Sequence, residues 1–200
     1  MGFRYEIRLS GSGGQGIILM GIILAEAIGI HEGNYVAQTQ SYGPEARGGS
    51  SKSEVIVSDA EIDYPKAMHP DLLLAMNQKS SDDFYSDLKP EGTLIVDSTF
   101  VAQLPTPKAY QIPFTRIARE KFKREMVANI IALGALTQFT SIVSPKAVEA
   151  AVLERVPKGT EKLNRDALKA GIAAAKRAKK ERTETELPPE VPKEDLLDSY

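Results

Sequence analysis

A glycine-rich segment near the amino terminus has the residue types and spacing of a phosphate-binding loop. The segment Gly11-Ser12-Gly13-Gly14-Gln15-Gly16 fits the pattern G-x-G-x-x-G and stands between a predicted strand and a predicted apolar helix. Glycine lets a ligand approach the backbone closely, and the amides at the start of a helix attract negative charge. We therefore predict that residues 11–16 bind a cofactor through their backbone.

Other interpretations of this loop differ in what they require nearby. A dinucleotide site needs an acid near the end of the second strand, but that strand ends in Gln38-Thr39-Gln40 and Glu32 precedes it. NAD is therefore disfavoured. A Walker loop is also disfavoured, because no Lys-Ser or Lys-Thr pair follows the last glycine. A tight turn that joins strand to helix and binds nothing stays open.

A second polar loop, over residues 39–53, follows the second predicted strand. Arg47 stands there beside two glycines, and its planar guanidinium could bind a carboxylate or a phosphate. The alternative is that Arg47 holds its own loop through Glu45 or backbone carbonyls. If the first two strands are parallel, both loops meet at the sheet edge where α/β proteins bind ligands. The residues that we predict to bind ligand in this second group are Ser41, Tyr42, Arg47, Gly48, Gly49 and Asn77.

The elements that would position these loops follow from hydrophobic patterning. Short apolar runs bounded by turn residues predict strands, and longer apolar or capped segments predict helices. This order predicts a three-layer α/β domain with a mostly parallel central sheet, a Rossmann-like first strand-loop-helix unit and a helical carboxyl-terminal part. The strands are expected at 5–10, 35–40, 53–58, 72–76, 93–97 and 109–112. The helices are expected at 17–29, 119–139, 145–156 and 161–182, with a further helix starting at Ser80.

Composition excludes several classes of function. The chain has 25 Lys and Arg residues against 27 Asp and Glu, so no overall basic field would attract nucleic acid or a membrane. It has no cysteine, which excludes a disulfide framework, a thiolate zinc site and a cysteine-ligated iron-sulfur cluster on this polypeptide. His31 and His69 are the two histidines, and neither has a catalytic or metal-binding set around it. We expect a cytoplasmic protein without a metal of its own.

The carboxyl-terminal part divides into a helix and a tail. Residues 1–182 are expected to form one domain, and residues 183–200, rich in acids and proline, a disordered tail. The basic residues at 176–182 are expected to form a solvated helix face, with partner docking as the alternative. Asn129, on an apolar segment, is expected to bond neighbouring backbone more readily than a ligand.

Four motifs in order resemble one known family. They are GSGGQGI at Gly11–Ile17, SYGPEARGG at Ser41–Gly49, SEVIVSDAEIDYP at Ser53–Pro65 and NIIALGAL at Asn129–Leu136. Together they resemble the gamma subunit of 2-oxoacid:ferredoxin oxidoreductases over about residues 5–155. The second and third motifs are most similar to those of the 2-oxoglutarate type.

The resemblance implies a subunit of a larger enzyme. Such an enzyme decarboxylates a 2-oxoacid on thiamine diphosphate with Mg, passes electrons through iron-sulfur clusters to ferredoxin, and transfers the acyl group to coenzyme A. The thiamine and the clusters belong to alpha, beta and delta-type subunits, so no catalytic residue is expected on this chain alone. The gamma domain is implied to cover the active site and to help bind coenzyme A. The alternatives are a pyruvate, branched-chain or indolepyruvate enzyme, or a nucleotide-binding module that acts alone.

Overall fold

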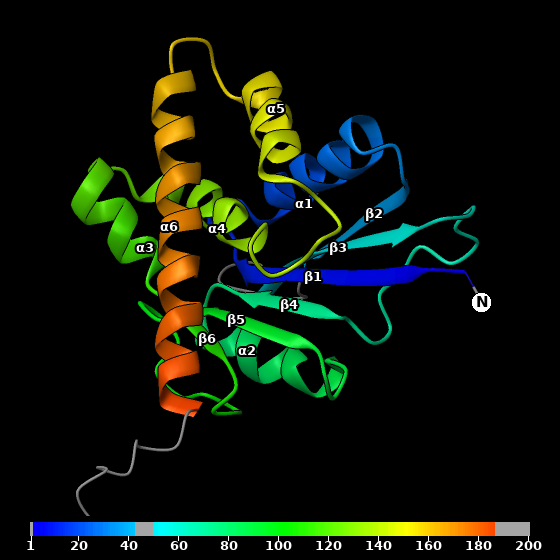
Figure 1. The fold of residues 1–200 in the computed structure, drawn as a ribbon, viewed down its shortest axis with the longest axis horizontal. Coiled ribbons are helices and arrows are strands. Elements are labelled where there is room, and N and C mark those ends of the chain that lie inside the picture. Colours follow the sequence, from blue (N-terminus) through cyan, green and yellow to red (C-terminus); the bar gives the residue numbers. More distant parts are fainter. Residues whose placement is uncertain (1, 43–49, 187–200) are drawn as a thin grey trace, which may run out of the picture.

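A six-stranded sheet forms the centre of the computed structural model, which describes residues 2–42 and 50–186 (Figure 1). The order of the strands across the sheet is β2-β3-β1-β4-β5-β6. The strands are β1 (Arg4–Ser12), β2 (Tyr35–Tyr42), β3 (Ser50–Ser58), β4 (Leu72–Ala75), β5 (Thr93–Asp97) and β6 (Tyr110–Ile112).

Strand direction confirms the prediction of a mostly parallel sheet. β1, β4, β5 and β6 pair in parallel, whereas β3 is antiparallel to both β1 and β2. Because β1 and β2 both run against β3, they run in the same direction as each other. Their carboxyl ends therefore lie at the same edge of the sheet, as the placement of the two loops required.

Helices cover both faces of this sheet. In Figure 1, α1, α4, α5 and α6 lie on one side and α2 on the other. The helices are α1 (Ile17–Glu26), α2 (Gln78–Phe84), α3 (Phe114–Ile117), α4 (Ala128–Leu136), α5 (Pro145–Arg155) and α6 (Glu161–Glu186). Short π or 3-10 segments are η1 (Ala27–His31), η2 (Tyr85–Asp87), η3 (Ala118–Phe122) and η4 (Glu125–Val127).

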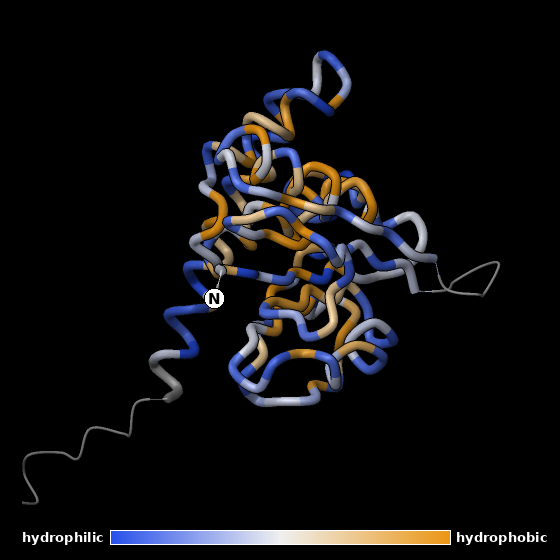
Figure 2. Tube along the Cα trace, turned by 90° about the vertical axis from the view of Figure 1, so that its right-hand side faces the viewer, coloured by the Kyte–Doolittle hydropathy of each residue, from blue (hydrophilic) through white to orange (hydrophobic). Residues whose placement is uncertain are grey.

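The larger apolar core lies between the sheet and the four-helix side. All nine residues of α4 are buried there, and the hydrophobic stretches of Figure 2 gather in the interior. A smaller core under α2 contains Leu73, Ala75, Leu94 and Val96. The alternation along each strand sends successive side chains to these two cores. The three-layer prediction is confirmed.

One predicted helix is wrong. The segment 119–139 was expected to be continuous, but it contains η3, a reversal at Lys123, η4 and then α4. Lys123 has a left-handed φ of 55° and Arg124 is extended, so the helical hydrogen-bond ladder cannot continue through them. The charged first half of the segment has no apolar stripe that would bury it as one helix with α4.

The first helix is shorter and less buried than expected. The α-helical part ends at Glu26 and continues as the π turn η1. Its core side packs between the sheet and α5, but Leu19 is 39% exposed and Ile30, beyond it, is 69% exposed. The apolar helix that is buried on every side is α4 rather than α1.

The last helix extends past its predicted end and is fixed to the sheet edge. Lys179 Nζ donates to Gln138 O at 2.8 Å, and Arg182 Nη1 donates to Lys108 O at 2.7 Å. The Arg182 guanidinium also lies 4.6 Å from the ring centre of Tyr110 on β6. Lys176, Arg177, Lys179 and Lys180 are exposed, as expected of a solvated face, but Lys179 and Arg182 also bond neighbouring segments of the chain. Residues 187–200, most of the predicted tail, lie outside the described residues.

Within residues 2–42 and 50–186, no helix is long and apolar enough to cross a membrane. The same residues contain no group of three or more His, Asp or Glu side chains that could hold a metal ion. Each histidine is accounted for by local structure. His31 Nε2 lies 3.6 Å from Glu154, and His69 donates its backbone N–H to Glu6.

Candidate functional site

The glycine loop lies between two neighbouring strands, β1 and β4, whose following helices pack on opposite faces of the sheet. β1 and β4 are neighbours and parallel, but the chain leaves β1 for α1 on one face and leaves β4 for α2 on the other (Figure 1). In open α/β sheets such a divergence opens a crevice beyond the carboxyl ends of the strands, where ligands bind. The loop after β1 is therefore at the expected edge.

Gln15 fastens the loop to the end of β4. Its Oε1 accepts the backbone N–H of Ser12 at 2.7 Å, and its Nε2 donates to Met76 O at 3.1 Å. The Gln15 backbone N–H also donates to Ser12 O at 3.2 Å. Both ends of the Gln15 side-chain amide are therefore bonded within the chain, and the predicted cofactor contact through the loop backbone stays a prediction.

Asn77 closes the same crevice from the other strand. Its Oδ1 accepts the backbone N–H of Ser80 at 2.8 Å, and its Nδ2 donates to Ser12 Oγ at 2.5 Å. Asn77 is therefore the N-cap of α2, and the predicted helix start at Ser80 is wrong by three positions. In this structure Ser12 and Asn77 bond to each other, and each organises the loop.

The glycines divide into two that are enclosed and two that are open. A Cβ on Gly11 would lie 2.6 Å from Gln15 Oε1, and one on Gly16 would lie 2.4 Å from Asn129 Nδ2. Gly13 and Gly14 are exposed, and a Cβ on either would meet nothing within 4 Å. Gly11 and Gly16 thus serve close packing within the chain, whereas the backbone at Gly13 and Gly14 is open at the surface.

Asn129 has a structural role that the sequence left open. Its side chain packs on Gly16, and its Oδ1 accepts the backbone N–H of Ile130 at 2.8 Å. Gly16 itself has a φ of 72°, a conformation that glycine adopts without strain. The NIIALGAL motif therefore supports the glycine loop directly from α4.

Two cavities flank Gly14. The smaller, of about 260 Å³, is lined by Gln15, Met76, Thr115 and Glu125 as well as by Gly14. The larger, of about 290 Å³, lies between the loop, α1 and the start of α6, and we call it the apolar cavity. Met126, which is 79% exposed, lines both. The apolar cavity is lined mainly by Leu19, Ile130, Val156, Pro157 and Leu163, with Arg124 on its wall.

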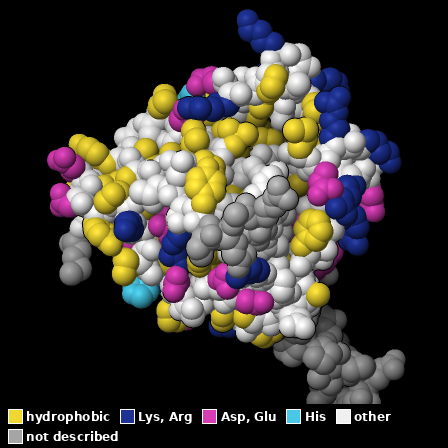
Figure 3. Space-filling model, turned by 180° about the vertical axis from the view of Figure 1, so that it is seen from behind, with side chains coloured by type: hydrophobic (Ala, Val, Ile, Leu, Met, Phe, Trp, Pro, Cys, Tyr) yellow, Lys and Arg dark blue, Asp and Glu magenta, His cyan; other side chains and the backbone are white. Residues whose placement is uncertain are grey.

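A basic segment beside these cavities was missed by the sequence reasoning. Residues 116–124 carry Arg116, Arg119, Lys121, Lys123 and Arg124, all exposed. Arg119 Nε pairs with Glu125 at 2.7 Å, and this hydrogen bond raises the pKa of Arg119. Figure 3 shows Lys and Arg side chains gathered along the upper right of the face that it presents. The density of basic residues in this stretch was a usable signal in a chain with a net charge of −2.

The second loop is brought to this edge, although its centre lies outside the described residues. Ser12 on β1 pairs with Ser50, the first residue of β3, and Tyr42 ends β2 beside it. Ser41 and Tyr42 are exposed. Arg47, Gly48 and Gly49 fall among residues 43–49, so their predicted role stays a prediction, as does the alternative pairing of Arg47 with Glu45.

A family model described as pyruvate ferredoxin/flavodoxin oxidoreductase matches residues 6–174, which include the glycine loop, both cavities and most of α6. The chain belongs to this family. It is 51% identical over 177 residues to the 2-oxoglutarate synthase subunit KorC of Methanocaldococcus jannaschii, covering 86% of this chain and 95% of that protein. The predicted resemblance to a gamma subunit, most like the 2-oxoglutarate type, is confirmed.

Solved structures show the same fold in related proteins. The gamma subunit of a keto/oxoacid ferredoxin oxidoreductase from Geobacter sulfurreducens superposes with a TM-score of 0.80 at 47% identity, covering 88% of this chain and 98% of that one. A 2-oxoglutarate:ferredoxin oxidoreductase from Magnetococcus marinus, with 2-oxoglutarate, coenzyme A and succinyl-CoA bound, gives 0.78 at 24% identity. This chain covers 31% of that longer protein, and the likeness establishes the fold alone.

Proposed function

We propose that this chain is the gamma subunit of an enzyme that converts 2-oxoglutarate, coenzyme A and oxidised ferredoxin to succinyl-CoA, CO2 and reduced ferredoxin. The observation that carries the proposal is the 51% identity, over nearly its whole length, to a 2-oxoglutarate synthase subunit. Membership of an oxidoreductase family supplies the reaction class. The identity of the 2-oxoacid substrate is a more specific claim than the reaction class.

The division of labour follows from the chemistry that this sequence can supply. Without cysteine it cannot ligate an iron-sulfur cluster through thiolates, and the glycine loop lacks the features of a dinucleotide or Walker site. Thiamine diphosphate with its Mg and the clusters therefore belong to alpha, beta and delta-type partners in this proposal. Ferredoxin accepts electrons from the assembled complex.

The contribution of this chain is a surface at the carboxyl edge of the sheet. Gly13 and Gly14 allow another molecule to approach the backbone, and α1 begins immediately behind them with no acid in its first turn. The amides at a helix start favour an anion, and the apolar cavity beside them favours an uncharged group. These features fit coenzyme A, which accepts the acyl group in the reaction and carries both phosphates and apolar parts.

Reconstitution tests the proposal. The purified chain alone should be colourless and should not reduce a viologen dye with any 2-oxoacid and coenzyme A. The complex assembled with its partner subunits should do so, with a higher kcat/KM for 2-oxoglutarate than for pyruvate. Turnover by the isolated chain would overturn the subunit role. A preference for pyruvate in the complete complex would overturn the substrate while leaving the family unchanged.

A further inference from the structure

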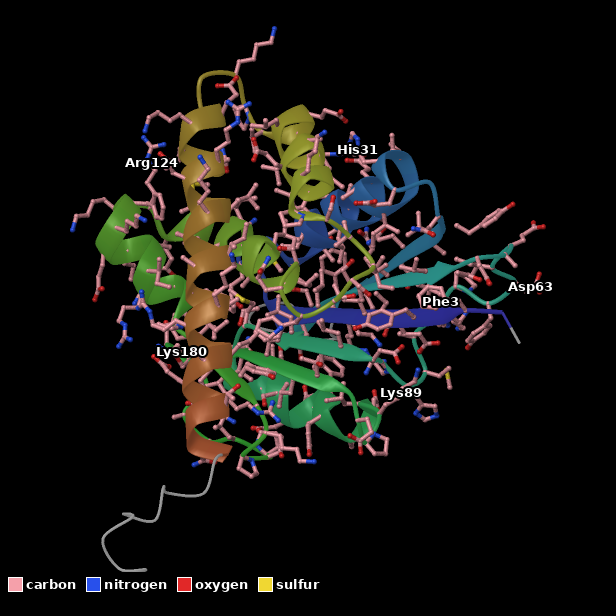
Figure 4. The ribbon with its side chains drawn as sticks, viewed as in Figure 1. Phe3, His31, Asp63, Lys89, Arg124 and Lys180 are labelled. Carbon is pink, nitrogen blue, oxygen red and sulfur yellow. The ribbon has the colours of Figure 1, made fainter. Side chains whose placement is uncertain are left out.

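Arg124 is a cation on the wall of the apolar cavity. Its backbone is extended where the chain passes from η3 to η4, and it lies beside the first half of α6 in Figure 4. The same cavity is lined by Gly14 and Gly16 of the glycine loop. Among residues 2–42 and 50–186, no acidic side chain forms an ion pair with Arg124. Its charge is therefore available at a cavity that the glycine loop also borders.

The neighbouring acid does not offset this charge. Glu125 follows Arg124 in the chain, but its carboxylate is engaged by Arg119 at 2.7 Å. The Arg119 guanidinium is also placed over the Phe100 ring, 5.4 Å from its centre. Arg119 and Glu125 thus form a closed pair, which leaves Arg124 as the uncompensated cation on this wall.

The start of α1 adds positive potential to the same cavity. α1 has ten residues, begins at Ile17 next to Gly16, and has no acidic residue in its first turn. Unpaired amides and the helix dipole make such a start attractive to anions. Two independent sources of positive charge, a guanidinium and a helix start, therefore border a cavity whose remaining walls are mostly apolar.

We propose that Arg124 binds the phosphates at the nucleotide end of coenzyme A. This inference rests on the proposed function and makes it more specific. The pantetheine arm of coenzyme A is uncharged, so only its nucleotide end carries groups that a guanidinium and helix amides recognise. The adenine can lie against the apolar walls near Leu19 and Met126. A cavity of about 290 Å³ has room for one such segment of the ligand, not the whole molecule.

The direct test measures binding of adenosine 3′,5′-bisphosphate to the assembled complex by titration calorimetry. Arg124→Ala should weaken binding roughly ten- to a hundredfold, the usual loss for one charge-assisted contact, and Arg124→Lys should retain part of the affinity. Arg177→Ala is the matched control, because Arg177 is an exposed arginine further along α6. Dissociation constants for Arg124→Ala within twofold of the Arg177→Ala value would overturn the inference.

Turnover distinguishes a phosphate contact from a docking contact. Arg124→Ala should lower kcat/KM for coenzyme A but leave the value for pantetheine, which has no phosphate, unchanged. An equal loss with both acceptors, or loss of the complex on gel filtration, would assign Arg124 to a partner subunit and overturn the inference.

Gly13→Val tests the proposed function separately. A Cβ there meets no atom of this chain within 4 Å, so we expect valine to obstruct an outside molecule. If Gly13→Val impairs use of coenzyme A while Arg124→Ala does not, the inference fails and the proposed function stands. If neither variant impairs it, both fail.

Discussion

At the amino-terminal half of β1, Arg4, Glu6 and Arg8 lie beneath residues 59–71, and each is paired within the chain. Arg8, only 3% exposed, bonds Glu54 at 2.9 Å, Ala67 O at 2.9 Å, and Asp87. Glu6 accepts the backbone N–H groups of residues 68 and 69. Beyond the carboxyl end of the same strand, Gly13 and Gly14 are open and Arg124 has no acidic partner among the described residues.

This contrast separates structure from recognition in one strand. Buried charges must be satisfied internally because an unpaired one costs several kcal/mol. Polar groups that serve an outside molecule must instead remain available at the surface. We therefore expect charged residues in the first half of β1 to affect stability, and we propose that polar groups after its end affect binding. Variants in the first region should change the free energy of unfolding, and variants in the second region should change the kinetic constants for coenzyme A.

The largest effect should come from Arg8→Ala. Removing the guanidinium leaves the buried Glu54 with one remaining ion-pair partner, Lys52, at 3.0 Å. It also removes the hydrogen bond to Ala67 O that ties the 59–71 segment to β1. We expect a loss of about 3–5 kcal/mol in the free energy of unfolding by urea. Complexes that still assemble should keep the wild-type KM for coenzyme A. Arg177→Ala, an exposed arginine, should change stability by no more than about 0.5 kcal/mol. Equal stabilities of the two variants would remove the basis of the comparison.

Gln15→Ala should affect both measurements, because Gln15 joins the two regions. Its loss frees the Ser12 N–H and the Met76 carbonyl, which should cost about 1–3 kcal/mol and loosen the glycine loop. We expect a raised KM for coenzyme A with little change in the KM for 2-oxoglutarate. Gln78→Ala is the control, because the Gln78 side chain makes three hydrogen bonds to residues 102 and 103, away from the glycine loop. A raised KM in both variants would indicate general loosening.

The smallest effect belongs to an ion pair outside both regions. Arg155 lowers the pKa of Glu26 mainly through a hydrogen bond of 2.7 Å. A depressed carboxyl pKa stabilises the fold above the ordinary value of about 4.3, and this stabilisation is lost as the pH falls through the lower, folded value. Arg155→Ala should therefore be slightly less stable than wild type at pH 7, and the difference should shrink as the pH falls below about 4. A difference that does not change with pH would contradict this assignment.

Much of the fold could be predicted because its signals are local. The strand Thr93–Asp97 was predicted at both ends because it is a short apolar run between a turn and a polar residue. The helix predicted at 145–156 is α5 to within one residue, and Ser144 caps it by accepting the Ala147 N–H on its Oγ at 3.1 Å. Both of these signals depend on a few neighbouring residues. The shared edge of the two loops was predicted on the condition that the first two strands run in the same direction, and they do.

The rest depended on contacts between distant residues. The ligand-binding roles of Gln15 and Asn77 stay predictions, but the sequence did not reveal that Gln15 bonds Met76, 61 positions away. Only the pairing of β4 beside β1 makes that bond possible. The segment around Arg124 was assigned to one helix because its composition suits a helix. The reversal at Lys123 results from α4 burying every residue while the charged segment before it remains at the surface.

The central claim is that the open glycines face another molecule, and two glycines in the chain test it most directly. Gly14 and Gly33 have φ values of 91° and 76°, and a Cβ on either meets nothing within 4 Å. Gly33 precedes β2, at the opposite end of the sheet. Alanine at either position should therefore cost a similar amount of stability, about 1–2 kcal/mol.

The deciding measurement is kcat/KM for coenzyme A in complexes that contain Gly14→Ala or Gly33→Ala, assembled to the same extent by gel filtration. The account predicts that Gly14→Ala lowers this value by about tenfold or more, because a displaced ligand reacts poorly, while Gly33→Ala leaves it at the wild-type level. Equal values for the two variants would contradict the account, since the open glycine loop would then be a turn that no other molecule contacts.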